Sequence, residues 1–185
     1  MTERAPKTES KLLAIIGLVW GLSFIGAVLL YAIFRLSAVT VDALDNFPFF
    51  WYHWLVLGLV VVFMAHSEGY HGFQKNFSPR VLSRAWFLYH HPRPRLIVLA
   101  PVFLAGYIHI NPVRQRITMM LTFGILMLII LIGYLPQPWR GIVDAGVVVG
   151  LSWGVVSLVI YGIRILGSRP FVYAPEVPGE SEVNP

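Results

Sequence analysis

Residues 55–74 read LVLGLVVVFMAHSEGYHGFQ, and this stretch joins a strongly apolar run to a polar segment. The apolar half has the composition of a transmembrane helix, and the polar half brings two histidines and a glutamate directly behind it. The two glycines of the polar half are typical of a turn that leads the chain out of a helix. The sequence therefore predicts that a membrane helix ends near Ala65, and that His66, Glu68 and His71 lie where this helix meets water.

The overall composition extends this interpretation to the whole chain. Of its 185 residues, 57% are hydrophobic and only 12% are charged, and the mean hydropathy is +0.70. These values lie outside the usual range of a soluble domain and predict an integral membrane protein, which we expect in the bacterial inner (plasma) membrane. The absence of cysteine excludes disulfides, thiolate metal sites and cysteine nucleophiles.

The basic residues indicate which partners to expect. The formal charge is +5, but lysine and arginine flank the apolar runs, as topology signals and contacts to lipid phosphates do. We therefore expect the lipid bilayer and its anionic headgroups as partners, and no nucleic acid.

Four apolar runs are long enough to cross a hydrocarbon core, which takes about 20 residues of helix. A fifth, at 96–110, is short and interrupted by Pro101 and Gly106, which predicts a half-length segment that is re-entrant, interfacial or a short span. The fold class is thus an all-α integral membrane protein with four transmembrane helices and this extra segment. The four spans are expected at 12–34, 47–65, 117–135 and 141–163.

The positive-inside rule favours four crossings over five. With four spans and a cytoplasmic N-terminus, 12 of the 14 lysines and arginines are cytoplasmic, and only Arg35 and Arg140 are outside. If 96–110 also crosses, the division becomes nine against five. We therefore expect both termini in the cytoplasm.

Residues 79–90 predict an amphipathic helix that lies in the membrane plane. Ser78 is the expected N-cap and Pro79 the first helical residue. The basic face, with Arg80 and Arg84, would contact lipid phosphates or a partner subunit. The apolar face comprises Val81, Leu82, Ala85, Trp86 and Tyr89.

The chain divides into three parts. Residues 1–11 form a cytoplasmic N-terminal segment, and 12–166 form a single polytopic membrane domain. Residues 167–185 are rich in proline and acidic residues without apolar periodicity, so we expect a disordered tail.

Glycines at four-residue intervals predict close helix packing, because they leave one helix face without side chains. The first and fourth expected spans both carry this pattern, so they would pack together or mediate self-association. The glycines are Gly17 and Gly21 in the first span and Gly146, Gly150 and Gly154 in the fourth.

A metal site at the cytoplasmic interface is the main chemical hypothesis, because imidazoles and a carboxylate suit zinc, iron, copper or manganese. Histidine is also common at membrane interfaces without binding metal. On a regular α-helix, residues five apart point about 140° away from each other, so His66 and His71 would converge only if the helix ended between them. The candidate ligands are His66, Glu68, His71, His90, His91 and His109.

Haem is not expected, since the spans at 12–34, 117–135 and 141–163 contain no histidine to oppose one from the second span. Asp144 is the only acidic residue within an expected span. Arg140, four residues earlier, lies on the same helix face, which predicts a local ion pair; the alternative is a proton or substrate relay.

The sequence contains no GxxxxGK or GxGxxG motif, and its one GxSxG match, GLSWG at 150–154, lies inside the apolar run 141–163 and not at the strand-to-helix turn that a nucleophilic serine requires. We therefore expect a non-enzymatic scaffold, accessory or assembly subunit of a membrane complex, without a cofactor. One alternative is a membrane enzyme or redox protein that uses a divalent metal at the histidine cluster. Another is a proton-coupled carrier built around Asp144.

Overall fold

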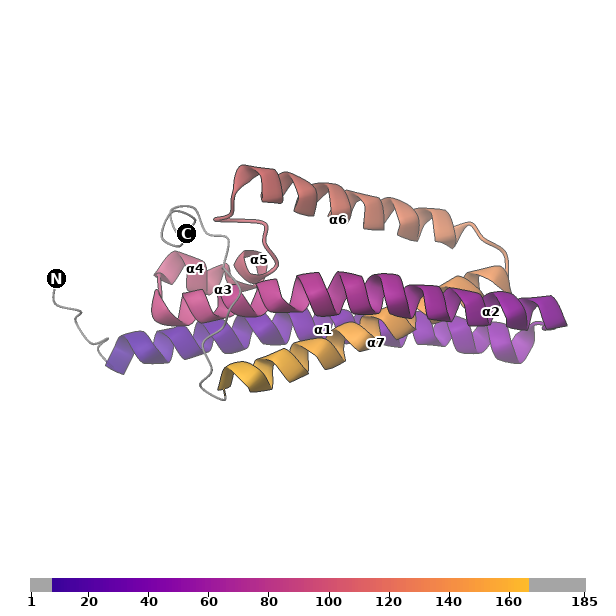
Figure 1. Ribbon diagram of the computed structural model, residues 1–185, viewed down its shortest axis with the longest axis horizontal. Helices are drawn as coiled ribbons and strands as arrows, with labels where there is room; N and C mark the ends of the chain where they lie inside the picture. The colour runs from indigo at the N-terminus through magenta and orange to yellow at the C-terminus, as the bar shows by residue number, and fades with distance from the viewer. Residues whose placement is uncertain (1–7, 167–185) are drawn as a thin grey trace.

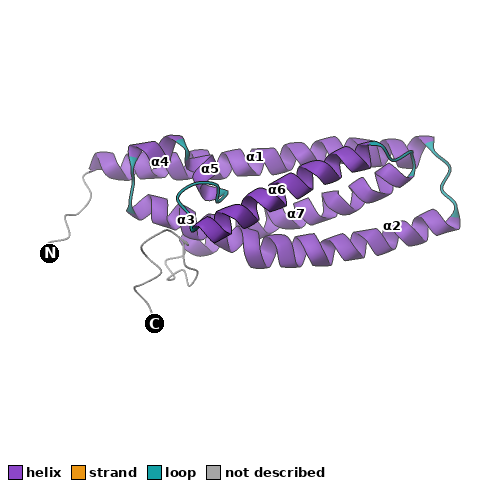
Figure 2. Cartoon of the chain, turned by 90° about the horizontal axis from the view of Figure 1, so that it is seen from above, coloured by secondary structure: helices purple, strands orange, loops and turns teal. Residues whose placement is uncertain are grey.

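The computed structural model describes residues 8–166, which form eight helices and no strand. The longest helix, α1 (Thr8–Asn46), has 39 residues and is therefore about 58 Å long. It packs side by side with α7 (Trp139–Leu166) and contacts the last part of a second long rod, whose first two parts pack on α7 instead (Figure 1, Figure 2). The all-helical prediction is confirmed. The predicted tail at 167–185 and residues 1–7 of the N-terminal segment lie outside the described part of the chain.

The second rod consists of three consecutive helices that run antiparallel to α1. Its middle part is a π-helix, in which each N–H bonds to the carbonyl five residues earlier. The backbone stays in the right-handed helical region at both junctions, so the chain passes from one helix into the next without a turn. The three helices are α2 (Trp51–Met64), η1 (Ala65–Phe77) and α3 (Ser78–His90).

Two local predictions about this rod are wrong. The helix does not turn after Ala65, and Ser78 is not an N-cap but an internal helical residue whose N–H donates to the Phe73 carbonyl. A turn beside α7 would leave backbone polar groups without partners, whereas a continued helix pairs them. In consequence α3 follows the line of α2 (Figure 1) instead of bending away from it.

Within residues 8–166, three helices are long and apolar enough to cross a membrane, namely Lys11–Asn46, Pro112–Gly133 and Trp139–Arg164. They contain or overlap the spans expected at 12–34, 117–135 and 141–163. These helices support an integral membrane protein. The remaining expected span, 47–65, corresponds to α2, which has 14 residues before the π-helix begins.

The apolar segment expected at 96–110 folds into two five-residue helices, α4 (Pro94–Val98) and α5 (Ala100–Leu104). Both pack on α1, and α5 also packs on α3. The chain then turns through Gly106 and His109, which have φ of 85° and 53°, and enters the next long helix. The segment thus stays close to the end of α3.

Helix α6 (Pro112–Gly133) has little contact with the rest of the described chain, and none of its residues is buried. It runs beside the bundle and is separate from it in Figure 1. In its first half, the Gln115 side chain donates to the Tyr107 carbonyl at 2.8 Å, and Thr122 Oγ1 pairs with Tyr107 Oη at 2.7 Å. α6 is therefore anchored through the turn that precedes it.

The tightest core lies where α3, α4 and α5 meet α1. It contains Val81, Leu82, Ala85 and Leu88 of α3, Ala100, Phe103 and Leu104 of α5, and Ile25 of α1. The α3 face expected to enter lipid is thus largely buried in protein. Truncating a core side chain such as Phe103 to alanine would cost about 3–5 kcal/mol.

Candidate functional site

The polar segment that follows the apolar run is the π-helix η1, and it lies beside the middle of α7. Gly150 faces the Glu68 side chain, whose Cβ is 3.1 Å from the position of an added Gly150 Cβ. Gly154 faces the Phe73 ring in the same way at 2.6 Å, and Gly69 of η1 faces Trp153 at 2.9 Å. Glycine on both helices therefore allows the close approach.

Two polar contacts reinforce this packing. Trp153 Nε1 donates to Gln74 Oε1 at 2.7 Å. At the junction of η1 and α3, the hydroxyls of Ser78 and Ser157 share a hydrogen bond inside the protein, where both side chains are buried. These contacts with α7 thus fix the position of η1 along the long axis of the bundle.

The glycine patterns pack within the chain. Gly17 and Gly21 of α1 face the short helices α4 and α5, where Ile97, Ala100 and Leu104 fill the space beside them. The α7 glycines instead receive side chains from α2 and η1, with Gly146 against Val60 and Met64. The first and last expected spans do pack together, because α1 lies along α7, but their repeated glycines contact other elements. The spacing of the glycines predicts close packing, but it does not specify which helix packs against each glycine face.

His66 and His71 lie side by side on the outer face of η1. Their ring centroids are 4.9 Å apart with the rings edge to face, and both residues are exposed. A π-helix has about one turn per 4–5 residues, so positions five apart share a face. The expected divergence of about 140° holds only for an α-helix, and here the histidines converge within an unbroken helix.

The other candidate metal ligands lie elsewhere. The His90 ring packs on Trp86 at 4.4 Å between centroids, and the His91 ring packs on Phe87 at 4.9 Å. His90 follows His66 by 24 residues of continuous helix, which separates them by about 30 Å. His109 lies in the turn after α5, near Phe103. Within residues 8–166, no three His, Cys, Asp or Glu side chains come close enough to hold one ion.

Glu68 points from η1 toward α7, away from the exposed histidines. An added Cβ at Gly150 would lie 3.2 Å from its Oε2. The carboxyl is therefore packed against the backbone of α7 and does not complete a ligand set with His66 and His71.

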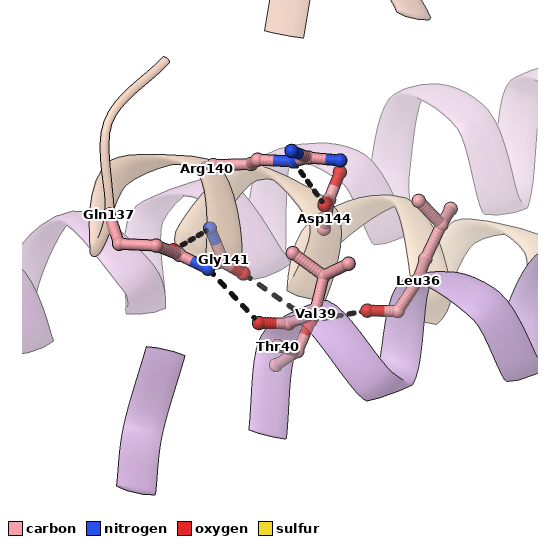
Figure 3. A network of polar contacts seen from close by, with 7 residues as sticks. All are labelled: Leu36, Val39, Thr40, Gln137, Arg140, Gly141 and Asp144. Carbon is pink, nitrogen blue, oxygen red and sulfur yellow. Dashed lines mark hydrogen bonds and ion pairs between the residues drawn. The ribbon is translucent and has the colours of Figure 1, made fainter. Parts of the chain in front are cut away.

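Arg140 and Asp144 lie at the start of α7, with Arg140 Nε 3.8 Å from Asp144 Oδ2. The adjoining turn holds α1 and α7 together (Figure 3): Gln137 Oε1 accepts from the Gly141 N–H at 3.0 Å, and Thr40 Oγ1 donates to the Gly141 carbonyl at 3.4 Å. Asp144 itself is 3% exposed. These residues form a helix-end network in which the carboxylate faces a cation from its own helix.

Comparison with known proteins gives no relative. No protein-family description, no curated protein and no solved structure matches this chain.

Arg84 is the residue that sequence reasoning placed wrongly. It was expected on the basic face toward lipid, but it is 2% exposed. Its guanidinium donates from Nε to the Phe103 carbonyl at 2.7 Å and from one terminal nitrogen to the carbonyls of Ile108 and His109 at 2.6 and 3.2 Å. The sequence did contain a signal for this burial, because Arg84 shares one face of an α-helix with the apolar residues at 81, 85 and 88. Arg84 fastens the turn after α5 to α3.

Proposed function

We propose that this protein is a non-enzymatic assembly subunit of a membrane complex and that it binds another membrane protein through the outer face of η1. The observation that carries the proposal is a row of exposed polar residues halfway along the bundle. This row, the outer stripe, consists of His66, His71, Lys75 and Asn76.

The depth of the outer stripe supports this proposal. Gly150, opposite Glu68, is 11 residues from the start of the candidate span Trp139–Arg164, or about 16 Å along the helix. A hydrocarbon core is about 30 Å thick. If α7 crosses along its whole length, the outer stripe lies near the bilayer centre, where one lysine costs about 3 kcal/mol against lipid. Polar groups of a partner helix would remove that cost.

The packing of the helices within the chain determines which surface we propose for the partner. The glycine faces and much of α3 are covered by this chain itself. They are not free for a second protein. The outer stripe remains open, and its contacts within the chain are local, such as Lys75 Nζ at 4.5 Å from the Tyr70 ring centre.

For topology we propose four crossings, by α1, the rod that begins with α2, α6 and α7. Arg84 binds the Phe103 carbonyl of α5 and the Ile108 carbonyl of the following turn, and this supports a segment 96–110 that returns to the side it left. An even number of crossings places both termini on one side. The distribution of lysine and arginine favours the cytoplasm of a bacterial inner membrane.

Topology can be measured because the chain has no native cysteine. In this arrangement Gln115→Cys reacts with an impermeant maleimide from the cytoplasmic side. Labelling from the outside alone would require 96–110 to cross and would overturn the four-crossing proposal.

The test of assembly is native electrophoresis of membranes from the source cells, solubilised in mild detergent. Wild-type protein should migrate as a complex larger than one 20.9 kDa chain in its micelle. The variant His71→Leu with Lys75→Leu should lose this complex. The matched control His90→Leu with Arg93→Leu makes the same chemical change at the end of α3 and should keep it.

Two results would contradict assembly through the outer stripe. One is a wild-type chain that migrates alone, and the other is equal loss of the complex in the control variant. Circular dichroism of each purified variant checks that its helices are intact.

The carrier built around Asp144 has less support. Its carboxylate faces Arg140 at a helix end, and the polar side chains around it bind backbone groups that join α1 to α7. Such contacts stabilise the helix end.

A further inference from the structure

We infer that His66 and His71 form a two-imidazole site for a divalent transition-metal ion on the outer face of η1. The ion would lie on the surface proposed for assembly and so deepens that proposal. The inference itself rests on the geometry of the two rings and does not require a partner protein.

The ring separation fits shared coordination. Metal–nitrogen bonds of about 2.0–2.1 Å place the centres of two imidazoles on one ion about 4.5–5.2 Å apart, for nitrogen–metal–nitrogen angles of about 90–110°. The observed centroid distance is 4.9 Å. Both residues are exposed on the surface of the chain, so ion binding requires no rearrangement inside the bundle.

The π-helix provides this arrangement and neighbouring rings support it. Tyr70 packs against both imidazoles, at 5.9 Å from His66 and 5.2 Å from His71 between centroids. The backbone at His71 is also held, since the Asn76 side chain donates to its carbonyl at 2.7 Å. The two histidines therefore need little ordering before they bind an ion.

Two protein ligands define the kind of site. Structural zinc centres take four protein ligands and catalytic ones three, so a pair of imidazoles leaves coordination positions open for water or for groups of a neighbouring chain. Among divalent ions at such nitrogen sites, Cu²⁺ binds most tightly and Ni²⁺ and Zn²⁺ less so. The site is thus an open half-site and not a closed metal centre.

The experiment uses the full chain, purified in mild detergent without a histidine tag, and titrates it with Cu²⁺ and with Zn²⁺. We expect one ion per chain and, for Cu²⁺, an electron paramagnetic resonance spectrum with couplings from two nitrogens. His66→Ala and His71→Ala should each weaken binding at least tenfold.

The control is His90→Ala with His91→Ala, which removes two adjacent histidines whose rings pack on different aromatic side chains. This variant should bind as the wild type does. Unchanged binding by the double variant His66→Ala with His71→Ala, or loss of binding in the control, would overturn the inference.

The outcome is independent of the assembly test. If the chain binds no ion but still forms the larger complex, the metal site is contradicted and the assembly proposal stands. If the chain binds the ion but migrates alone, the metal site stands and the assembly proposal is contradicted.

Discussion

The helices η1 and α3 are consecutive and have 13 residues each, yet they place their basic and aromatic side chains on opposite faces. η1 sets glycine and phenylalanine against α7 and leaves histidines and a lysine outside. α3 buries Arg84 together with its aliphatic residues and leaves Trp86 and Tyr89 exposed. The partner makes the difference, because α5 and its turn offer carbonyls to a cation, whereas α7 offers a groove of glycines. Polarity alone therefore does not tell which face of a helix is inside.

The largest effect is expected on the α3 side, from Arg84→Leu. This change removes a buried cation and leaves the carbonyls of Ile108 and His109 without their donor, which should lower the free energy of unfolding by about 3 kcal/mol. Thermal unfolding in detergent, followed by circular dichroism, measures it. The control Arg80→Leu removes a contact to the exposed Asn76 carbonyl and should cost under about 1 kcal/mol. Equal costs would mean that the contacts of Arg84 to α5 and its turn stabilise the protein no more than an exposed contact does.

The η1 side is tested by two glycines of the same segment. An added Cβ at Gly69 meets the Trp153 side chain at 2.9 Å, whereas at Gly72 it meets only a backbone oxygen at 3.5 Å. Gly69→Ala should therefore destabilise the protein by about 1–3 kcal/mol through overpacking. Gly72→Ala should be neutral or stabilising by up to about 1 kcal/mol, since alanine favours the helix. The same unfolding measurement applies, and a reversed order would disprove the close contact with α7.

The junction between the two helices should show an intermediate effect. Ser157→Ala leaves the buried Ser78 hydroxyl without its side-chain partner and should cost about 1 kcal/mol. In the double variant Ser78→Ala with Ser157→Ala both hydroxyls are gone, so part of the loss should return. Strictly additive losses in this double-mutant cycle would show that the two hydroxyls do not interact.

The smallest effect on stability is expected for His66→Ala. Its ring is exposed and contacts only neighbours on η1, so the free energy of unfolding should change by less than about 0.5 kcal/mol. A cost above about 1 kcal/mol would mean that the imidazole pair stabilises η1. The exposed His66 would then resemble the buried Arg84 in contributing to stability.

Local sequence patterns predicted the long helices, but they did not predict which helices contact one another. The apolar lengths at 12–34, 117–135 and 141–163 predicted long helices because a helix satisfies its own backbone groups and its length follows from its residues. The spacing of Arg140 and Asp144 likewise predicted a contact within one turn. The glycine spacing predicted close packing, but the identity of the helix that fills each face depends on the arrangement of the whole chain.

The histidines show the limit most clearly. The sequence by itself determined a helical, membrane-type chain, with polar groups behind one apolar run. Only the tertiary structure decided that these groups continue as a π-helix against α7, which pairs His66 with His71 and separates both from His90. The physical reason is that glycine contacts along α7 favour an unbroken rod with satisfied backbone hydrogen bonds. A turn, favoured locally by the same glycines, would give up those contacts.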